Sequence, residues 1–220
     1  MLICIPDVLT DSDIQALRGG LADVEFVDGK ETASGQAQDV KNNLQVSKKD
    51  PKLELLRKLV FDRLNKNEMF SSSVRPKAIS YLLFSKYEPG MAYGTHVDNP
   101  MMGMMRTDVS FTLFLSDPDS YEGGELIIET VSGEQPVKLP AGAMVAYPST
   151  FLHRVAEVTE GERLAAVGWI RSYIRDSAKR ELMFDLDTVR KALHDRSGTE
   201  AERTVLNKTI ANLSRMWSDD

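Results

Sequence analysis

The sequence predicts an α+β protein with a mainly β core, helices before that core and a helical extension after it. Two observations support this prediction. Apolar residues recur at helical spacing before about residue 74 and again after residue 176. Between these segments, runs rich in β-branched and aromatic residues alternate with turn sequences roughly every 8–12 residues. This order is typical of a β-sandwich or jelly roll with accessory helices.

A helix between two short strands is expected at the N-terminus. The apolar runs Leu2–Ile5 and Val24–Val27 predict the strands. Thr10 is a suitable N-cap for the helix, and acidic residues in the first turn favour the helix dipole. This helix should end at Gly19-Gly20, since glycine is favoured just after a helix.

A polar stretch and a second helix follow. Gly29–Gln38 predicts a mobile loop, and Val40–Asn43 consists of residues typical of a turn. The second helix should begin at Asp50-Pro51, because proline is favoured at the first helical position. Its apolar residues have helical spacing: Leu53, Leu56, Leu59, Val60 and Leu64.

A series of short strands is expected over about residues 77–173. They are Lys77–Tyr87, Arg106–Ser116, Gly123–Thr130, Ala143–Tyr147, Leu152–Val158 and Leu164–Ile174. Turn sequences such as Asp117-Pro-Asp-Ser and Glu160-Gly-Glu162 separate them. Because a jelly roll folds its strands back in antiparallel pairs, residues far apart in sequence can face each other inside it.

Two helices, Ala178–Leu193 and Thr199–Trp217, separated by Gly198, are expected at the C-terminus. The second carries an apolar stripe formed by Val205, Leu206, Ile210 and Leu213, with Trp217 near its end. The stripe needs a partner, either the barrel or a second subunit, so a homo-oligomer formed through these helices is one of two alternatives. The predicted division is a domain over 1–175 and a helical extension over 176–220.

Composition excludes several classes of protein. The net charge of −6 and pI near 5.2 disfavour a nucleic-acid-binding surface, and no apolar run approaches the roughly 20 residues of a membrane span. The N-terminus lacks the basic segment of a signal peptide, which predicts a cytoplasmic protein. The single cysteine, Cys4, excludes an intrachain disulfide, fits a reducing compartment and is expected to be a small buried hydrophobe.

The segment Tyr87–Pro100 carries the strongest chemical signal. It contains His96-x-Asp98, and on an extended strand residues two apart point to the same face. An imidazole and a carboxylate side by side provide two of the three ligands of a non-haem Fe(II) site that keeps positions open for substrate and oxygen. A third ligand must come from elsewhere in the chain.

His153, at the start of a predicted strand, is the best third ligand. Antiparallel folding makes a triad of His96, Asp98 and His153 geometrically reasonable; the alternative is a hydrogen-bonded strand histidine. His194, near the end of a predicted helix, is most simply a surface residue.

Arg163 begins the strand after the turn at residues 160–162. A guanidinium directed into a barrel is costly unless an anion meets it, and its fork binds a carboxylate with two hydrogen bonds. A keto acid that chelates iron at one end and meets Arg163 at the other would explain this position. Alternatively, Arg163 is a solvated turn residue beside Glu160 and Glu162.

Taken together, these motifs resemble the Fe(II)/2-oxoglutarate dioxygenases, and within them the prolyl/lysyl-hydroxylase-like PKHD-type hydroxylases, often called bacterial iron-uptake factors. The resemblance covers most of the chain. It rests on Val40-Lys-Asn-Asn43, Tyr87–Pro100, Gly123-Gly-Glu-Leu126, Leu139-Pro-Ala-Gly142, Tyr147-Pro-Ser with His153-Arg-Val155, Arg163, and Arg180–Asp187 in the helical tail.

The resemblance implies a double-stranded β-helix in which His96, Asp98 and His153 hold Fe(II). It further implies Arg163 on the distal carboxylate of 2-oxoglutarate, with the Tyr87 hydroxyl on the same co-substrate. Some relatives place a second hydroxyl-bearing aromatic residue in this pocket, where this chain has Phe114. Ascorbate is implied as a reductant by the resemblance alone.

The activity implied is hydroxylation of a substrate C–H bond, coupled to decarboxylation of 2-oxoglutarate to succinate and CO₂. The alternatives are a cupin-like protein that binds or senses iron without turnover, and a nucleic-acid demethylase, which the acidic composition disfavours. A protein side chain, peptide, siderophore or small metabolite could be the substrate. The methionine-rich segment Met101–Met105 is either a flexible lid or a loop that packs an irregular gap.

Overall fold

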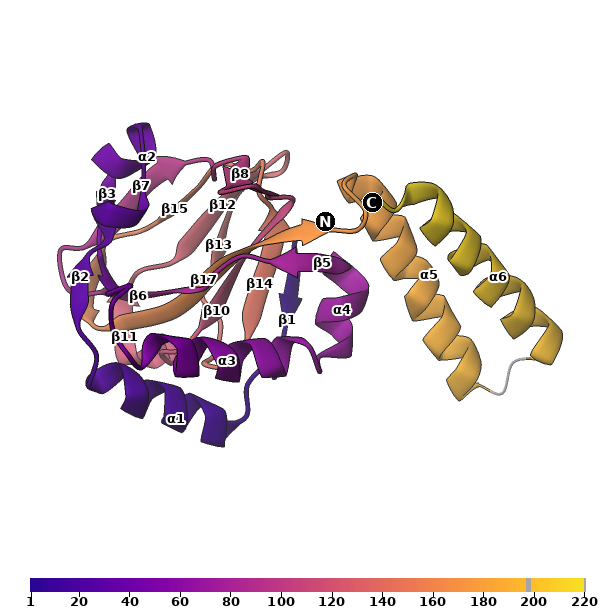
Figure 1. The fold of residues 1–220 in the computed structure, drawn as a ribbon, viewed down its shortest axis with the longest axis horizontal. Helices are drawn as coiled ribbons and strands as arrows, with labels where there is room; N and C mark the ends of the chain where they lie inside the picture. The colour runs from indigo at the N-terminus through magenta and orange to yellow at the C-terminus, as the bar shows by residue number, and fades with distance from the viewer. Residues whose placement is uncertain (197–198, 220) are drawn as a thin grey trace.

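The computed structural model describes residues 1–196 and 199–219 and contains two facing layers of antiparallel strands with helices outside one layer (Figure 1). The larger sheet has the order β1 (Ile3–Ile5), β14 (Met144–Pro148), β10 (Val109–Phe114), β17 (Arg163–Ser172), β6 (Leu83–Tyr87), β4 (Leu44–Val46) and β2 (Phe26–Asp28), with β5 (Pro76–Ile79) also paired to β17. The smaller sheet has the order β13 (Gly133–Val137), β12 (Leu126–Thr130), β15 (His153–Val155), β7 (Ala92–His96) and β3 (Lys41–Asn42). The predicted double-stranded β-helix is confirmed.

Two short strand pairs complete the core: β11 (Tyr121–Gly123) with β16 (Val158–Gly161), and β8 (Met101–Met102) with β9 (Met105–Arg106). The predicted Met101–Met105 segment therefore forms a small hairpin, turning at Gly103, whose φ is +61°. Met104 at its tip is fully exposed, whereas Met102 lines the central cavity. A lid function for this hairpin stays a prediction.

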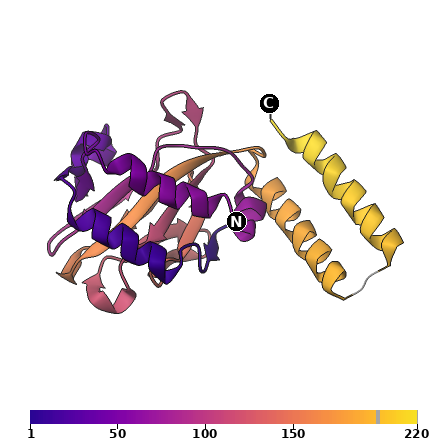
Figure 2. The same ribbon diagram turned by 60° about the horizontal axis from the view of Figure 1, so that its bottom comes forward.

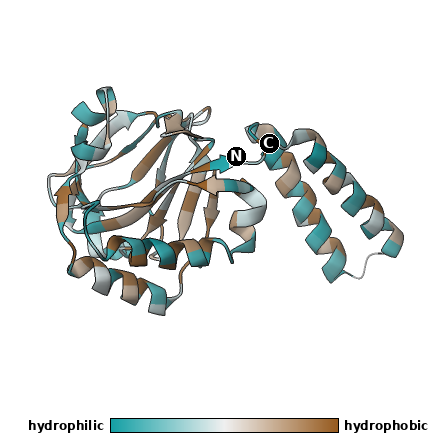
Figure 3. Ribbon diagram, in the orientation of Figure 1, coloured by the Kyte–Doolittle hydropathy of each residue, from teal (hydrophilic) through white to brown (hydrophobic). Residues whose placement is uncertain are grey.

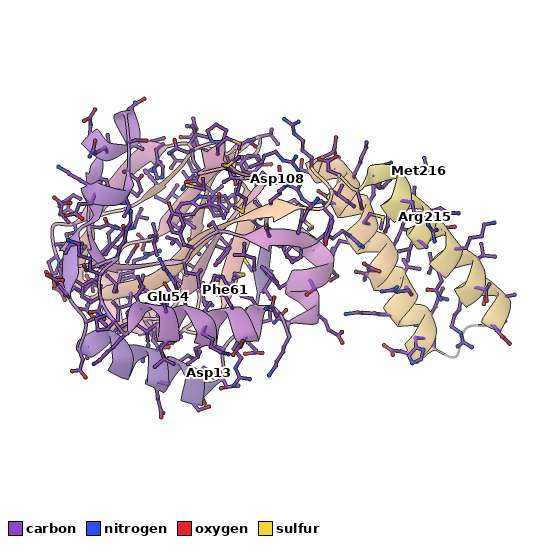
Figure 4. The ribbon with its side chains drawn as sticks, viewed as in Figure 1. Asp13, Glu54, Phe61, Asp108, Arg215 and Met216 are labelled. Atoms are coloured by element: carbon purple, nitrogen blue, oxygen red, sulfur yellow. The ribbon has the colours of Figure 1, made fainter. Side chains whose placement is uncertain are left out.

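Helices α1 (Asp11–Ala22) and α3 (Leu53–Leu64) lie side by side across the outer face of the larger sheet (Figure 2). Their apolar faces enter the main hydrophobic cluster with Phe84 and Phe111 of the sheet. Asp13 of α1, labelled in Figure 4 with Glu54 and Phe61 of α3, forms an ion pair of 2.9 Å with Arg63. The two helices thus fix the back of the sheet whose other face lines the cavity. Helix α4 (Glu68–Val74) connects them to β5.

The N-cap of α1 is confirmed, but its predicted end is wrong. Thr10 accepts from the Asp13 backbone N–H, and Asp13 reciprocates in a capping box. The helix continues through Gly19 and Gly20 to Ala22. A Cβ at Gly20 would lie 2.6 Å from the Leu56 side chain, so this glycine allows α1 and α3 to approach rather than ending the helix.

The polar stretch before α3 contains more structure than predicted. The expected loop at residues 29–38 forms a 3₁₀ turn, η1 (Gly29–Thr32), and a short helix, α2 (Gln36–Asp39). The expected turn at residues 40–43 contains β3, where Lys41 pairs with Tyr93. Pairing with a strand about 50 positions away supplies backbone hydrogen bonds that local composition cannot reveal.

Several predicted strands are each divided into two. Lys77–Tyr87 separates into β5 and β6, both paired with β17. Gly123–Thr130 separates into the end of β11 and β12, because Gly123 and Gly124 both adopt positive φ, +69° and +66°. The burial predicted for Cys4 is also wrong: β1 is an edge strand, and Cys4 faces outward while Ile5 is buried.

Helices α5 (Ser177–Asp195) and α6 (Glu200–Trp217) form a hairpin beside the core, where the two chain termini also lie (Figure 1). The α6 stripe packs against α5 through Met183 and Ile210, an arrangement that neither predicted partner describes. In Figure 3 both helices alternate between hydrophilic and hydrophobic around their axes, as a two-helix hairpin requires. Val205 stays 62% exposed, so the prediction of a homo-oligomer stays open.

Ion pairs attach this hairpin to the core along α5 and after the end of α6. Arg75, after α4, pairs with the buried Asp187 of α5, and Arg106 pairs with Asp219 at 3.0 Å. Arg106 also binds Asp108, which Figure 4 shows on the side of the core nearest the hairpin. The division into 1–175 and 176–220 stays a prediction. No helix in the described part of the chain is long and apolar enough to cross a membrane.

Candidate metal centre and co-substrate pocket

The three predicted metal ligands meet at the end of the smaller sheet. Strands β7 and β15 are direct neighbours, and His96 lies opposite His153 in their register. Asp98 follows two residues after the end of β7. The triad was predicted from strands that face each other inside the barrel; instead, adjacent strands bring the histidines together, and a turn away from the strand delivers the carboxylate.

The ligand atoms of this cluster are close enough to share one ion. They lie within 4.8 Å of one another. His96 Nε2 is 4.0 Å from Asp98 Oδ1, and His153 Nε2 is 3.7 Å from Asp98 Oδ2. Two imidazoles and one carboxylate on one side of an ion form the donor set that non-haem Fe(II) sites use, and the other side stays open.

Each ligand is oriented by a second hydrogen bond. His96 Nδ1 lies 2.9 Å from the Gly94 carbonyl oxygen, and His153 Nδ1 lies 3.0 Å from that of Phe151. A carbonyl only accepts, so each Nδ1 carries the proton and each Nε2 offers its lone pair to the shared centre. The Ser110 hydroxyl donates to Asp98 Oδ2, which fixes the carboxylate in the same way.

Aromatic rings enclose the two imidazoles. Tyr93 stacks on His96 with a centroid separation of 3.7 Å and an interplanar angle of 17°, and Tyr147 contacts His153 edge-on at 5.1 Å. Burial, reinforced by the neighbouring His153, lowers the pKa of His96 to about 4. The His96 imidazole is therefore neutral at pH 7, the state a metal ligand requires.

Arg163 opens β17 and is not the solvated turn residue of the alternative interpretation, since it is only 1% exposed. Its guanidinium carbon lies 5.2 Å from the ring centroid of Tyr87, its partner in the register, and 5.4 Å from that of Phe114. Its Nε has no hydrogen-bond partner, and no ion pair to Arg163 is found within the described residues. A buried guanidinium held between two rings requires an anion.

The glycine motif after β11 makes room for this arginine. A Cβ on Gly124 would lie 3.0 Å from Arg163 Cδ and 2.9 Å from a methyl of Val158. Gly123-Gly-Glu-Leu126 contributed to the family resemblance, and the structure supplies a physical reason for its second glycine.

One cavity is lined by both the metal cluster and Arg163. Besides the predicted residues, its wall contains three buried polar side chains that the sequence interpretation missed: Lys41, Asn43 and Gln45. These three residues alternate with less buried neighbours, a pattern that predicts a strand. The pattern was overlooked because each of these residue types is also common in turns. Lys41 donates to Thr32 Oγ1 at 3.0 Å, and its burial lowers its pKa to about 8.

His194 lies outside this site. It is exposed on α5, and the cluster around Asp98 is the only group of potential metal ligands found in the parts of the chain that the structure describes. The prediction of a surface residue is confirmed.

Comparison with known proteins identifies the class. The family model of the 2OG-Fe(II) oxygenase superfamily matches residues 82–171, which contain His96, Asp98, His153 and Arg163. The fold resembles a prolyl-4-hydroxylase of Pseudomonas putida, with TM-score 0.53 and 21% identity over 78% of this chain and 92% of that one. It also resembles HygX of Streptomyces hygroscopicus, solved with nickel, 2-oxoglutarate and hygromycin B, with TM-score 0.57 and 15% identity over 79% and 84% of the two chains.

The chain belongs more narrowly to the PKHD-type hydroxylases. It is 52% identical to a PKHD-type hydroxylase of Picosynechococcus over the full length of both chains. A relative in Rippkaea orientalis is 50% identical over 99% of each chain. The protein is thus an enzyme of the 2-oxoglutarate-dependent Fe(II) oxygenase superfamily, as the sequence motifs predicted.

Proposed function

We propose that His96, Asp98 and His153 hold the catalytic Fe(II), and that Arg163 with Tyr87 binds 2-oxoglutarate for hydroxylation of a substrate yet to be identified. One observation carries this proposal: a two-histidine, one-carboxylate cluster shares a cavity with a buried guanidinium that has no anion. Both halves of a chelating dicarboxylate keto acid would be satisfied there.

The donor chemistry fits Fe(II). Two neutral imidazole nitrogens and a carboxylate oxygen suit a first-row divalent ion, although other such ions can compete. When bound, iron with 2-oxoglutarate and dioxygen supplies the oxidation of a C–H bond, leaving succinate and CO₂.

The chain's own residues position the reactants and exclude water. Gly94 and Phe151 hold the histidine tautomers, and Ser110 holds the carboxylate. Tyr93 and Tyr147 cover the imidazoles, so the ligands lie in a sheltered site where electrostatic interactions are strong. Arg163 fixes the orientation of the keto acid from its distal end.

Formation of succinate tests this proposal against the cupin-like alternative. The iron-loaded wild type, given 2-oxoglutarate and oxygen, should form succinate slowly even without added substrate, and His96→Ala should not. Stoichiometric iron binding without any succinate formation, under all conditions tried, would favour a binding or sensing protein. If succinate forms, a metabolite comparison between a deletion strain and its parent would narrow the substrate class.

Several finer expectations belong to the same proposal. Ascorbate as reductant rests on the family resemblance, and a cytoplasmic location rests on the composition and the single cysteine. A small-molecule, peptide or protein substrate is expected rather than a nucleic acid, because the chain has a net charge of −6. Self-association through α5 and α6 would cover the exposed part of their apolar surface.

A further inference from the structure

Unpaired polar atoms gather around the Arg163 end of the cavity. Arg163 Nε and both side-chain amide atoms of Asn43 are buried without a hydrogen-bond partner among the described residues. Such groups are uncommon in folded proteins, because each one loses its hydrogen bonds to water without a replacement. Because no protein group in the described chain satisfies these neighbouring atoms, we expect a polar ligand to bind there.

Asn43 is held firmly in this wall. It is 3% exposed, lines the cavity, and comes between β3 and β4 in the alternating segment that begins at Lys41. The backbone N–H of Gly29 donates to the Asn43 carbonyl at 2.8 Å, and a Cβ on Gly29 would lie only 1.9 Å from Asn43 Oδ1. The missing side chain at Gly29 thus leaves the space that the Asn43 amide occupies.

The Asn43 amide faces the same volume as Tyr87 and Arg163. Burial raises the pKa of Tyr87, while the positive charge of Arg163 and the nearby Asn43 amide oppose that rise. The amide is therefore close to the phenol, although neither of its atoms has the geometry of a hydrogen bond. Phe114, on the other side of the guanidinium, offers no polar atom.

We propose that Asn43 is an additional ligand of 2-oxoglutarate, donating from its side-chain amide to the distal carboxylate that pairs with Arg163. This inference rests on the proposed function. A carboxylate offers about four acceptor positions, of which the guanidinium fork uses two. The amide of Asn43 and the hydroxyl of Tyr87, which line the same cavity, would fill the others.

Asn43→Leu tests this assignment because leucine has nearly the shape of asparagine without its polar atoms. Asn42→Leu is the matched control, since Asn42 is the exposed neighbour that donates to the Gly90 carbonyl outside the cavity. The anaerobic Fe(II) proteins are titrated with 2-oxoglutarate and with 2-oxovalerate, which has the keto-acid head but no distal carboxylate. Iron content and the urea midpoint of the iron-free proteins are measured in parallel.

The expected result for Asn43→Leu is a loss of about tenfold or more in 2-oxoglutarate affinity, with 2-oxovalerate affinity and iron content unchanged. Its unfolding midpoint should rise, because two unpaired polar atoms are removed. Unchanged 2-oxoglutarate affinity, or equal losses for both keto acids, would overturn the assignment. If Asn43→Leu does not fold, Asn43→Ala is tested instead, and its affinities for 2-oxoglutarate and 2-oxovalerate are compared in the same way. A wild type that binds iron but no 2-oxoglutarate would instead overturn the proposed function, and this inference with it.

Discussion

The two ends of the cavity differ in how their polar groups are satisfied. At the proposed metal end, His96 and His153 donate to backbone carbonyls and Asp98 accepts from Ser110, so every proposed ligand is oriented within the protein itself. At the other end, Arg163 and Asn43 retain buried polar atoms without partners. The polar groups of the metal end are therefore oriented before any ion binds, whereas those of the Arg163 end gain hydrogen-bond partners only when a ligand binds.

This difference predicts how the protein responds to each ligand. A prearranged set of donors binds an ion with little rearrangement. An uncompensated cation instead destabilises the unloaded fold, and that destabilisation is relieved only when an anion arrives. Binding of the keto acid should therefore stabilise the folded protein. Mutations at the metal end should weaken metal binding, and mutations at the Arg163 end should weaken keto-acid binding without loss of metal.

The largest expected effect is at the metal end. His153→Ala removes one of the three proposed ligands and leaves only His96 and Asp98, so iron loading should fall strongly. Elemental analysis after anaerobic reconstitution measures it, with the exposed His194→Ala as control. Full iron occupancy in His153→Ala would mean that the ligands lie elsewhere.

Lys41 is the exception at the metal end, because its buried ammonium lies over Tyr93 and donates to the hydroxyl of Thr32 with no carboxylate paired to it among the described residues. Its folded pKa of about 8 lies below the unfolded value of 10.5, so burying the charged form is penalised below pH 8. The penalty is about 3 kcal/mol at pH 7, decreases as the pH rises through 8, and vanishes near pH 10.5.

Lys41→Met should accordingly stabilise the iron-free protein at pH 7, with a gain that shrinks toward pH 10.5. Urea unfolding at several pH values measures the difference, and the exposed Lys58→Met serves as control. A destabilisation that does not vary with pH would show that Lys41 supports the fold through packing instead.

A smaller effect is expected from the hydroxyl that orients Asp98. Ser110→Ala removes the donor to Oδ2 without touching a ligand atom, so metal affinity should fall about 10–100-fold. Ser116→Ala is the matched control, since its hydroxyl donates to the Glu162 carbonyl away from the metal. Equal metal affinity in both variants would remove Ser110 from the site.

The sequence predicted the metal end better than the opposite wall. His96, Asp98, His153 and Arg163 carry residue types whose chemistry is distinctive, and their spacing relative to predicted strands was sufficient to bring them together. Their exact arrangement was not predicted, because neighbouring pairing of β7 and β15 depends on the order of strands in the sheet.

Asn43 and Lys41 escaped prediction for a different reason. Asparagine and lysine are common in turns, and only the long-range pairing of β3 with β7 buries them. The continuation of α1 through Gly20 has a similar cause, since contact with Leu56 across two helices decides it. In each case a tertiary contact overrides local propensity.

The most direct test of separate roles for the two ends is the affinity of Arg163→Ala for 2-oxoglutarate, measured by anaerobic titration with the bound metal counted in the same samples. The loss of a charge-assisted interaction predicts about 10–150-fold weaker binding at unchanged metal content. Arg163→Lys should also bind more weakly than wild type, because it keeps the charge and loses the fork. Unchanged affinity in Arg163→Ala, or a loss of metal together with the keto acid, would contradict this account.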